Sequence, residues 1–296
     1  MDAGPRSRAL RAIIHGHLWL ACGAAAQTWF VQDLMDRSGW RAPLLGALAA
    51  FTGYTFMRLA RTGPAAGTGE QHLAWAAANR RPLLGAMVLC ALVALVVTGP
   101  HLPALWRMAW PLALVVALYA VPVSMTGGRA LGLRWVPLLK AFVIAGAWAW
   151  TTVGLPGVFA DGDTPRGGRA WLFTMQMAFF LAIALVFDLR DSERDKGDVR
   201  TLPQLLGGRI TRVIAMLLML YPAAVFALLA YIGRSMSALE GNPAWPWEMV
   251  LALLGYVLGA VLIARSATLR GPLDHGLVVD GLLVLVQLLY ASGLRL

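Results

Sequence analysis

The sequence predicts an all-α integral membrane protein, folded as one bundle of nine transmembrane helices over residues 1–296. Three observations carry this prediction. First, 59% of the residues are hydrophobic and 14% are charged, whereas a soluble domain carries about a quarter charged residues; the mean hydropathy is +0.66. Second, the apolar residues gather in nine segments. Third, the basic residues gather on alternate links between those segments.

Each apolar segment approaches the length of about 20 residues that a helix needs to cross a bilayer. In order along the chain, the segments are roughly 12–30, 42–60, 82–98, 105–122, 135–155, 170–187, 210–232, 247–264 and 277–292. No soluble domain, linker or low-complexity stretch separates them. A single integral domain is therefore the simplest organisation.

The distribution of basic residues predicts the orientation of the bundle. Most of the 25 Lys and Arg residues fall on links that are cytoplasmic if the N-terminus is cytoplasmic. Most of the 12 Trp residues then fall near the outer ends of the helices, where aromatic residues favour the interface. The links 61–81 and 188–209 are both cytoplasmic in this orientation, and the predicted location is the bacterial inner membrane. The net charge of +10 is scattered over short links, so we expect a lipid bilayer and no nucleic acid as partner.

The most charged stretch of the chain follows the sixth apolar segment. It contains Asp188, Asp191 and Asp195, spaced i, i+3 and i+7. If the helix continues through Asp195, the three side chains point in directions of roughly 0°, 300° and 340°, which is one face. Converging carboxylates suit Mg²⁺, which binds oxygen ligands and bridges carboxylates to phosphates. The alternative is a solvated helix end that Arg190 and Arg194 partly neutralise.

The flanks of this stretch make it more specific than a group of acids. It reads Asp188-x-x-Asp191-x-x-x-Asp195-Lys-Gly-x-x-Arg-Thr-Leu-Pro-x-Leu-Leu-Gly207. This pattern resembles the second aspartate-rich motif of the UbiA family of intramembrane prenyltransferases. The resemblance implies a UbiA-like nine-helix fold in which the three aspartates act catalytically, holding Mg²⁺ against the diphosphate of an isoprenoid donor. It also implies transfer of the prenyl group to an aromatic or lipid acceptor in or near the bilayer.

The first acidic motif of that family, Asn-x-x-x-Asp-x-x-x-Asp, is altered here. The nearest placement at the end of the second segment puts Tyr54, Arg58 and Thr62 at the three positions, and no carboxylate remains. One reading of Arg58 is a basic residue that extends to the membrane surface. The other is a guanidinium that replaces one metal and contacts the diphosphate through two hydrogen bonds, with Arg61 as its neighbour.

The fifth segment contains an intramembrane lysine, Lys140. A charged side chain at that depth is costly and is a functional-site candidate. We expect Lys140 to contact diphosphate oxygens or to pair with an aspartate of the 188–195 group; the alternative is extension to the surface. The family often has Tyr-x-x-x-Lys near here, whereas the fourth residue after Tyr119 is Val123. Together with Arg58 and Lys140, the expected substrate-binding residues are Tyr119, Arg194 and Lys196.

Other functions remain open at this stage. A non-catalytic descendant of the fold, acting as a lipid-diphosphate binder or a membrane assembly factor, is favoured by the loss of the first acidic motif. The CDP-alcohol phosphotransferases need Asp-x-x-Asp-Gly, whereas Ser192 follows Asp191 here. A transporter would show paired broken helices, and none are evident.

Several polar residues fit structural roles better than catalytic ones. His15 and His17, at the start of the first segment, are interpreted as interface residues. Gln176 in the sixth segment and Gln287 in the ninth are interpreted as hydrogen-bonding residues between helices.

Overall fold

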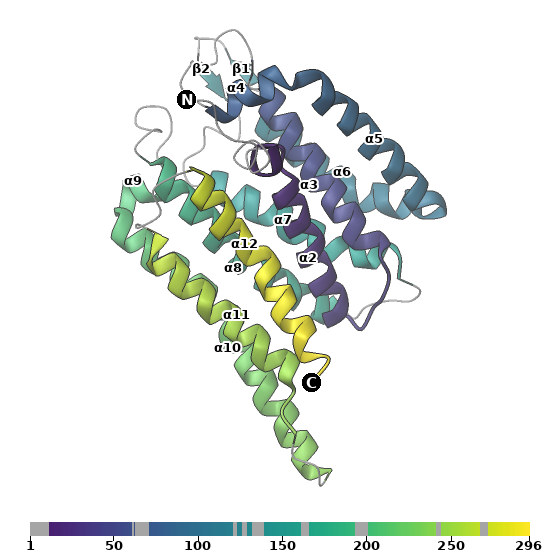
Figure 1. The fold of residues 1–296 in the computed structure, drawn as a ribbon, viewed down its shortest axis with the longest axis vertical. Coiled ribbons are helices and arrows are strands. Elements are labelled where there is room, and N and C mark those ends of the chain that lie inside the picture. Colours follow the sequence, from purple (N-terminus) through teal and green to yellow (C-terminus); the bar gives the residue numbers. More distant parts are fainter. Residues whose placement is uncertain are drawn as a thin grey trace.

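A computed structural model describes most of the chain. The described residues are 12–60, 62, 71–120, 123–125, 129–131, 139–160, 166–192, 201–240, 244–266 and 272–296. Apart from one short two-stranded hairpin, the regular structure in these ranges is helical (Figure 1). The expectation of an all-α membrane protein is therefore confirmed at the level of fold class.

Nine helices in the described ranges have 17 residues or more, and each coincides with one of the nine predicted segments. They are α2 (Leu18–Leu34), α3 (Arg41–Ala60), α5 (Arg80–Thr98), α6 (Leu102–Ala120), α7 (Leu139–Val158), α8 (Arg166–Asp191), α10 (Gly208–Leu239), α11 (Trp247–Ala264) and α12 (Pro272–Gly293). The shorter elements are α4 (Gln71–Ala78), the 3₁₀ helix η1 (Gly99–His101), β1 (Val123–Met125), β2 (Arg129–Leu131) and α9 (Leu202–Leu206). Strands β1 and β2 pair antiparallel.

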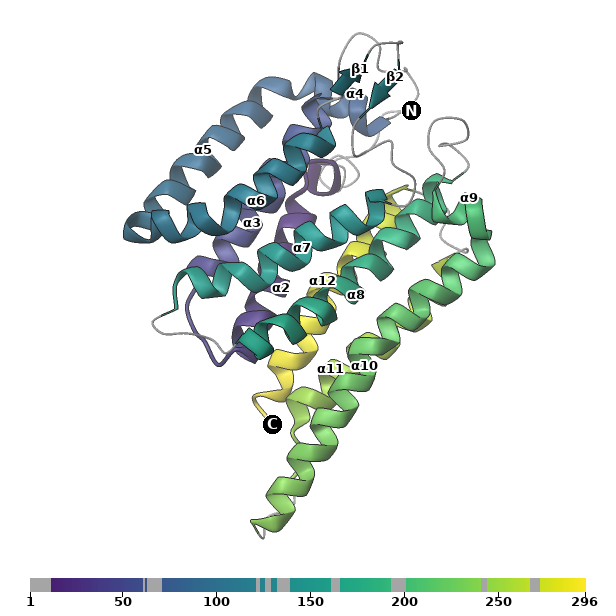
Figure 2. The same ribbon diagram turned by 180° about the vertical axis from the view of Figure 1, so that it is seen from behind.

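Six stretches in the described part of the chain are long and apolar enough to cross a membrane, as expected of a multi-pass membrane protein. They are Arg80–Val115, Leu139–Val158, Gly168–Asp191, Gly208–Leu239, Trp247–Ala264 and Gly276–Gly293. Helices α2 and α3 are not among them, and α5, η1 and α6 count as one stretch. The chain nevertheless turns back on itself at η1 (Figures 1 and 2). Gly99 permits this turn because its φ of 47° carries no Cβ strain.

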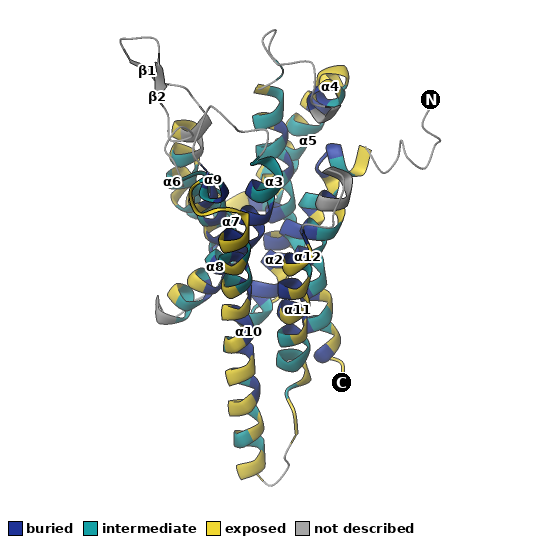
Figure 3. Cartoon of the chain, turned by 90° about the vertical axis from the view of Figure 1, so that its left-hand side faces the viewer, coloured by how far each residue is buried: buried dark blue, intermediate teal, exposed yellow. Residues whose placement is uncertain are grey.

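Three of the differences between the helix boundaries and the predicted ones change the shape of the bundle or of the site. The first segment is interrupted at Gly16 and His17, which form a turn in which His17 has a φ of 59°, so α2 begins only at Leu18. Helix α8 runs to Asp191, four residues beyond the predicted end. Helix α10 has 32 residues, and its end at Leu239 projects as a largely exposed arm (Figure 3). The prediction missed these boundaries because the length of an apolar run contains no information on turn geometry or on polar residues at helix ends.

The core lies where α2, α7, α8, α10, α11 and α12 meet. Helix α8 is mostly buried, whereas the helices of the α5–α6 hairpin expose most of their surface. Ala141, Ala145 and Ala149 of α7 are buried at a spacing of four residues, and α7 packs extensively against α8. Small residues at this spacing let two helix backbones approach closely. This packing holds the start of α7 beside the end of α8.

One end of the bundle collects the polar connections. Helix α4, the β1–β2 hairpin and α9 lie at this end, and the C-terminus lies at the other (Figure 1). We call it the motif end, because α3 and α8 finish there and α7 begins there. It therefore brings together three segments that are far apart in the sequence and carry the candidate functional residues.

Candidate functional site

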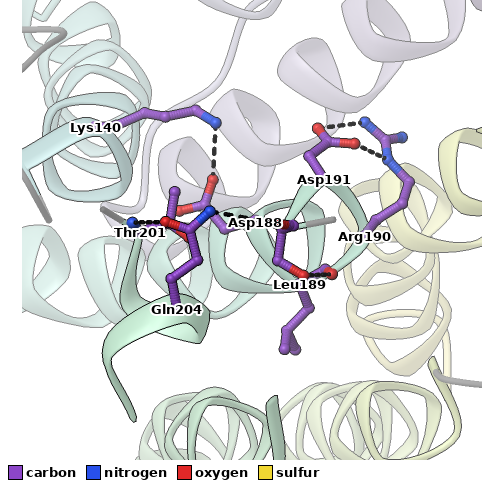
Figure 4. Close-up of polar contacts among 8 residues, drawn as sticks. Lys140, Asp188, Leu189, Arg190, Asp191, Thr201 and Gln204 are labelled. Carbon is purple, nitrogen blue, oxygen red and sulfur yellow. Dashed lines mark hydrogen bonds and ion pairs between the residues drawn. The ribbon is translucent and has the colours of Figure 1, made fainter. Parts of the chain in front are cut away.

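Asp188 is the buried carboxylate of the motif end. It lies in the last turn of α8 and is only 5% exposed. Its Oδ1 is 2.9 Å from Nζ of Lys140, the second residue of α7 (Figure 4). A buried carboxylate is stable only with a compensating charge or hydrogen bonds, and Lys140 supplies that charge. The expected pairing of Lys140 with an aspartate of the 188–195 group is thus confirmed.

Asp191 is paired differently. Its two carboxylate oxygens accept hydrogen bonds from Nε and Nη2 of the adjacent Arg190, at 2.7 and 2.9 Å. The Arg190 guanidinium also lies over the ring of Phe187, 4.9 Å from its centroid. Both members of this pair are about one quarter exposed. Figure 4 shows Asp188 directed at α7 and Asp191 directed at Arg190, so the two carboxylates do not share a cation among the contacts shown.

The prediction that three aspartates share one helix face assumed that the helix continues through Asp195. This assumption is wrong. Helix α8 ends at Asp191, and Ser192 lies in a turn. The Ser192 hydroxyl donates to the carbonyl oxygen of Leu189 at 2.8 Å. This bond satisfies one of the carbonyl groups that a helix end leaves without an intrahelical partner. Asp195 lies outside the described residues.

Helix α9 is tied to the end of α8 by a glutamine that the sequence analysis did not single out. Gln204 Oε1 accepts a hydrogen bond from the backbone N–H of Thr201 at 3.1 Å, and Gln204 Nε2 donates to the carbonyl oxygen of Ser192 at 3.3 Å (Figure 4). The signal was present, because Thr-x-x-Gln is a capping-box pattern for a helix start. Gly207, at the end of the motif, has a φ of 82° and separates α9 from α10.

Arg58 lies at the last turn of α3 and is half-buried. Its Nη1 donates to the carbonyl oxygen of His15 at 3.0 Å, which ties the end of α3 to the turn that precedes α2. His15 and His17, which the sequence analysis interprets as interface residues, are buried within the protein. They are covered because Trp75 of α4 and Tyr54 of α3 pack against their rings, with centroids 6.2 and 5.7 Å apart.

The other two positions of the altered first motif are also hydrogen-bonded. The Tyr54 hydroxyl accepts from Nε1 of Trp148 on α7 at 3.0 Å. The Thr62 hydroxyl donates to the carbonyl oxygen of Leu59 at 2.7 Å. The three side chains at the positions where the UbiA resemblance expects Asn, Asp and Asp therefore contact the protein itself. Tyr54 links α3 to α7 and Arg58 links α3 to the segment before α2, whereas Thr62 bonds to α3 itself.

Three expected substrate-binding residues cannot be placed at this site. Arg194 and Lys196 lie outside the described residues. Tyr119 is the penultimate residue of α6, but its side chain lies outside the described part of the structure. The site can therefore be built from Asp188, Lys140 and their neighbours alone.

The oxygen atoms of Asp188 and Asp191 are the kind of ligand that Mg²⁺ prefers. A basic side chain contacts each carboxylate, and a divalent cation can supply the same charge. In the described part of the chain, no group of three or more His, Cys, Asp or Glu residues lies close enough to hold a metal ion. The donor set therefore fits Mg²⁺ in chemistry, and further oxygen ligands would have to complete the site.

Models of protein families, curated proteins and solved structures were each compared with the chain, and none of them matches it.

Proposed function

We propose that this protein is a UbiA-like intramembrane prenyltransferase, which transfers a prenyl group from a prenyl diphosphate to an aromatic or lipid acceptor. One observation carries the proposal: a buried aspartate of the motif, Asp188, meets an intramembrane lysine, Lys140, at the end of the bundle that also holds Arg58. A buried pair of this kind inside a membrane is costly and is usually functional.

In this proposal, Mg²⁺ is held by Asp188, Asp191 and Asp195. When bound, it neutralises charge on the diphosphate as the allylic carbon–oxygen bond breaks. Lys140 lies close enough to contact the diphosphate as well, because its Nζ is 2.9 Å from Oδ1 of Asp188, one of the proposed metal ligands. In this proposal, Lys140 would donate a hydrogen bond to the diphosphate and Asp188 would be one of the residues that hold the metal. The apolar helices around the site exclude water from the reacting carbon.

Four further side chains complete the proposed substrate site. Arg58 contacts the diphosphate from the α3 side, in place of the missing first motif. Arg194 and Lys196 add positive charge from the motif itself, and Tyr119 approaches from the end of α6. Arg58 is currently held by the His15 carbonyl at 3.0 Å. Its guanidinium has five N–H donors, so it can keep this bond and still bind an anion.

We further propose that all nine long helices cross the membrane, with the N-terminus and the motif end on the cytoplasmic side. The chain reversal at η1 supports the separation of α5 from α6 into two spans (Figure 2). The basic residues on the links at the motif end support the orientation. A cytoplasmic motif end would meet a water-soluble prenyl diphosphate.

The second candidate is a non-catalytic protein of the same fold that binds lipid diphosphates or assists membrane assembly. A specific observation favours it: Tyr54, Arg58 and Thr62 are all engaged in contacts within the protein, as structural residues would be. A protein of this kind would still bind a diphosphate at Asp188 and Lys140. It would not transfer the prenyl group.

Transfer activity separates the two candidates. Membranes that contain the protein are incubated with radiolabelled prenyl diphosphates, Mg²⁺ and a lipid extract, and the label is followed into the lipid fraction. The enzyme predicts label in a new lipid that disappears with EDTA and in the Asp188→Asn variant. Binding of the diphosphate without any labelled product would identify the non-catalytic binder. Failure of binding would reject both the transferase and the diphosphate binder.

A further inference from the structure

One glutamine joins the end of α8 to the start of α9. Gln204 Oε1 accepts a hydrogen bond from the backbone N–H of Thr201 at 3.1 Å, and its Nε2 donates to the carbonyl oxygen of Ser192 at 3.3 Å (Figure 4). A backbone N–H can only donate and a carbonyl can only accept, so the two contacts require the same orientation of the side-chain amide. Gln204 is thus placed to hold the backbone that follows α8.

Helix α9 gives this glutamine a fixed base. Pro203 is buried, and Leu202 packs against the main hydrophobic core. The start of α10 also lies against the end of α8, because a Cβ atom added at Gly208 would lie 3.5 Å from Cδ2 of Leu189. The segment that carries Gln204 is therefore held in place by packing as well as by hydrogen bonds.

The hydrogen bonds continue from Ser192 into the last turn of α8. The Ser192 hydroxyl donates to the carbonyl oxygen of Leu189 at 2.8 Å, and Leu189 lies between Asp188 and Asp191 in the sequence. The last carbonyl groups of a helix have no intrahelical partner, and helix ends tend to fray. Gln204 and Ser192 together hold this turn from outside the helix.

Asp188 and Asp191 depend on this turn to different degrees. Asp188 is 5% exposed, and Lys140 of α7 contacts it at 2.9 Å, so a second helix holds it in place. Asp191 is about one quarter exposed, and its pair with Arg190 joins two neighbours on the same turn. That pair moves with the turn and does not anchor it. If the turn frays, we expect Asp191 to leave its position before Asp188 does.

We propose that Gln204 is a positioning residue for the proposed Mg²⁺ site, which holds the last turn of α8 so that Asp191 stays one helical turn from Asp188. The inference rests on the proposed function, because that function assigns both aspartates to the metal. Gln204 acts through the backbone of Ser192, without contact to the metal or the diphosphate. Residues that orient metal ligands in this way affect metal affinity when they are replaced.

Hydrogen exchange of the whole chain in lipid nanodiscs, without ligand, tests the hold on the turn. Gln204→Leu removes both contacts. Gln204→Glu keeps an acceptor for the Thr201 N–H, but an ionised carboxylate cannot donate to Ser192. We expect both variants to exchange the amides of residues 188–192 about threefold to tenfold faster than the wild type at neutral pH. Wild-type exchange in either variant would overturn the proposal.

The matched control is Gln32→Leu. Gln32 also bonds beyond the end of its own helix, because its Nε2 donates to the carbonyl oxygen of Gly39 at 2.8 Å, but α2 ends at the opposite end of the bundle. Gln176 and Gln287 form hydrogen bonds between helices, as expected, and match less closely. We expect Gln32→Leu to leave exchange at 188–192 unchanged. Equally fast exchange there would show general loosening of the bundle and would reject a local hold.

The Mg²⁺ dependence of farnesyl diphosphate binding separates a positioning role from a merely structural one. We expect Gln204→Leu to need about threefold to tenfold more Mg²⁺ than the wild type for half-maximal binding. At saturating Mg²⁺ its affinity should approach that of the wild type, because Arg58 and Lys140 are unchanged. Gln32→Leu should show the Mg²⁺ dependence of the wild type.

The failure of this inference and the failure of the proposed function give different results. If the wild type binds farnesyl diphosphate with Mg²⁺ and Gln204→Leu has the same half-maximal Mg²⁺ concentration, Gln204 only stabilises the fold and the inference is wrong. If the wild type shows no Mg²⁺-dependent binding, the proposed function is rejected, and the positioning role with it.

Discussion

The ends of α8 and α3 lie at the same end of the bundle but present opposite charges. At the end of α8, a buried carboxylate is held across a helix interface by Lys140. At the end of α3, Arg58 is held by a backbone carbonyl, and no acid stands at the positions where the UbiA resemblance expects them. Two acidic motifs would require several metal ions around a diphosphate. One acidic and one basic region could bind the same anion with fewer metal ions.

The comparison depends most strongly on topology, because the end of α8 and the end of α3 must face the same side of the membrane. Cysteines introduced by Asp198→Cys and Gly67→Cys, after replacement of Cys22 and Cys90, should be closed to an impermeant maleimide in sealed cells. Asp163→Cys should be labelled, because the 159–165 link lies on the opposite side in the predicted orientation. Labelling at position 67 but not at 198 would separate the two regions.

The next largest effect concerns the stability of the Lys140–Asp188 pair. Asp188→Leu alone removes the carboxylate that contacts the Lys140 ammonium and should lower the free energy of unfolding by roughly 1–3 kcal/mol. The loss should be less than for a fully buried pair because Lys140 is 30% exposed. The double variant Lys140→Met/Asp188→Leu removes both charges and should recover most of this loss. Thermal unfolding in detergent measures both. Additive losses would show that the two side chains do not stabilise one another.

A tenfold to hundredfold effect is expected for Arg58. Each charge-assisted bond between a guanidinium and a phosphate contributes about 1.5–3 kcal/mol, so Arg58→Ala should raise the Kd of a prenyl diphosphate on the order of tenfold to a hundredfold. Arg58→Lys should restore only part of the affinity, because lysine lacks the planar fork. Calorimetric titration at several Mg²⁺ concentrations gives these values. If Arg58→Ala binds as the wild type does, Arg58 only ties α3 to His15. If Arg58→Asp gains Mg²⁺-dependent turnover from an inactive parent, the protein has lost an ancestral activity.

The smallest effect is expected at Arg190. Its pair with Asp191 is about one quarter exposed on both sides, and such pairs contribute about 0–1 kcal/mol. Arg190→Gln should therefore change the unfolding temperature little, while freeing Asp191 for a metal. A loss of stability as large as that of Asp188→Leu would remove the contrast between the two aspartates.

The positions of the nine long helices could be predicted from the sequence, because each helix coincides with a long apolar run. The sequence also predicted, as one of two functional roles for Lys140, a pair with an aspartate of the 188–195 group, since a charged residue inside a membrane needs a partner. The prediction was wrong at two places where local backbone geometry sets the helix boundary. These are the turn at His17 and the end of α8 at Asp191, where the Ser192 hydroxyl donates to the carbonyl oxygen of Leu189. The burial of His15 and His17 depends on the packing of Trp75 and Tyr54, which no periodicity shows. The Gln204 contact was readable from its capping pattern and was missed.

The central claim is that Asp188 and Asp191 bind a diphosphate through Mg²⁺, and calorimetric titration with farnesyl diphosphate tests it most directly. The wild type should bind with Mg²⁺ and fail to bind with EDTA. Asp188→Asn and Asp191→Asn should each weaken Mg²⁺-dependent binding by at least about 100-fold, while the protein stays folded in detergent. The control Asp163→Asn, on the link 159–165, should bind as the wild type does. Unchanged Mg²⁺-dependent binding in Asp188→Asn and Asp191→Asn would contradict the claim.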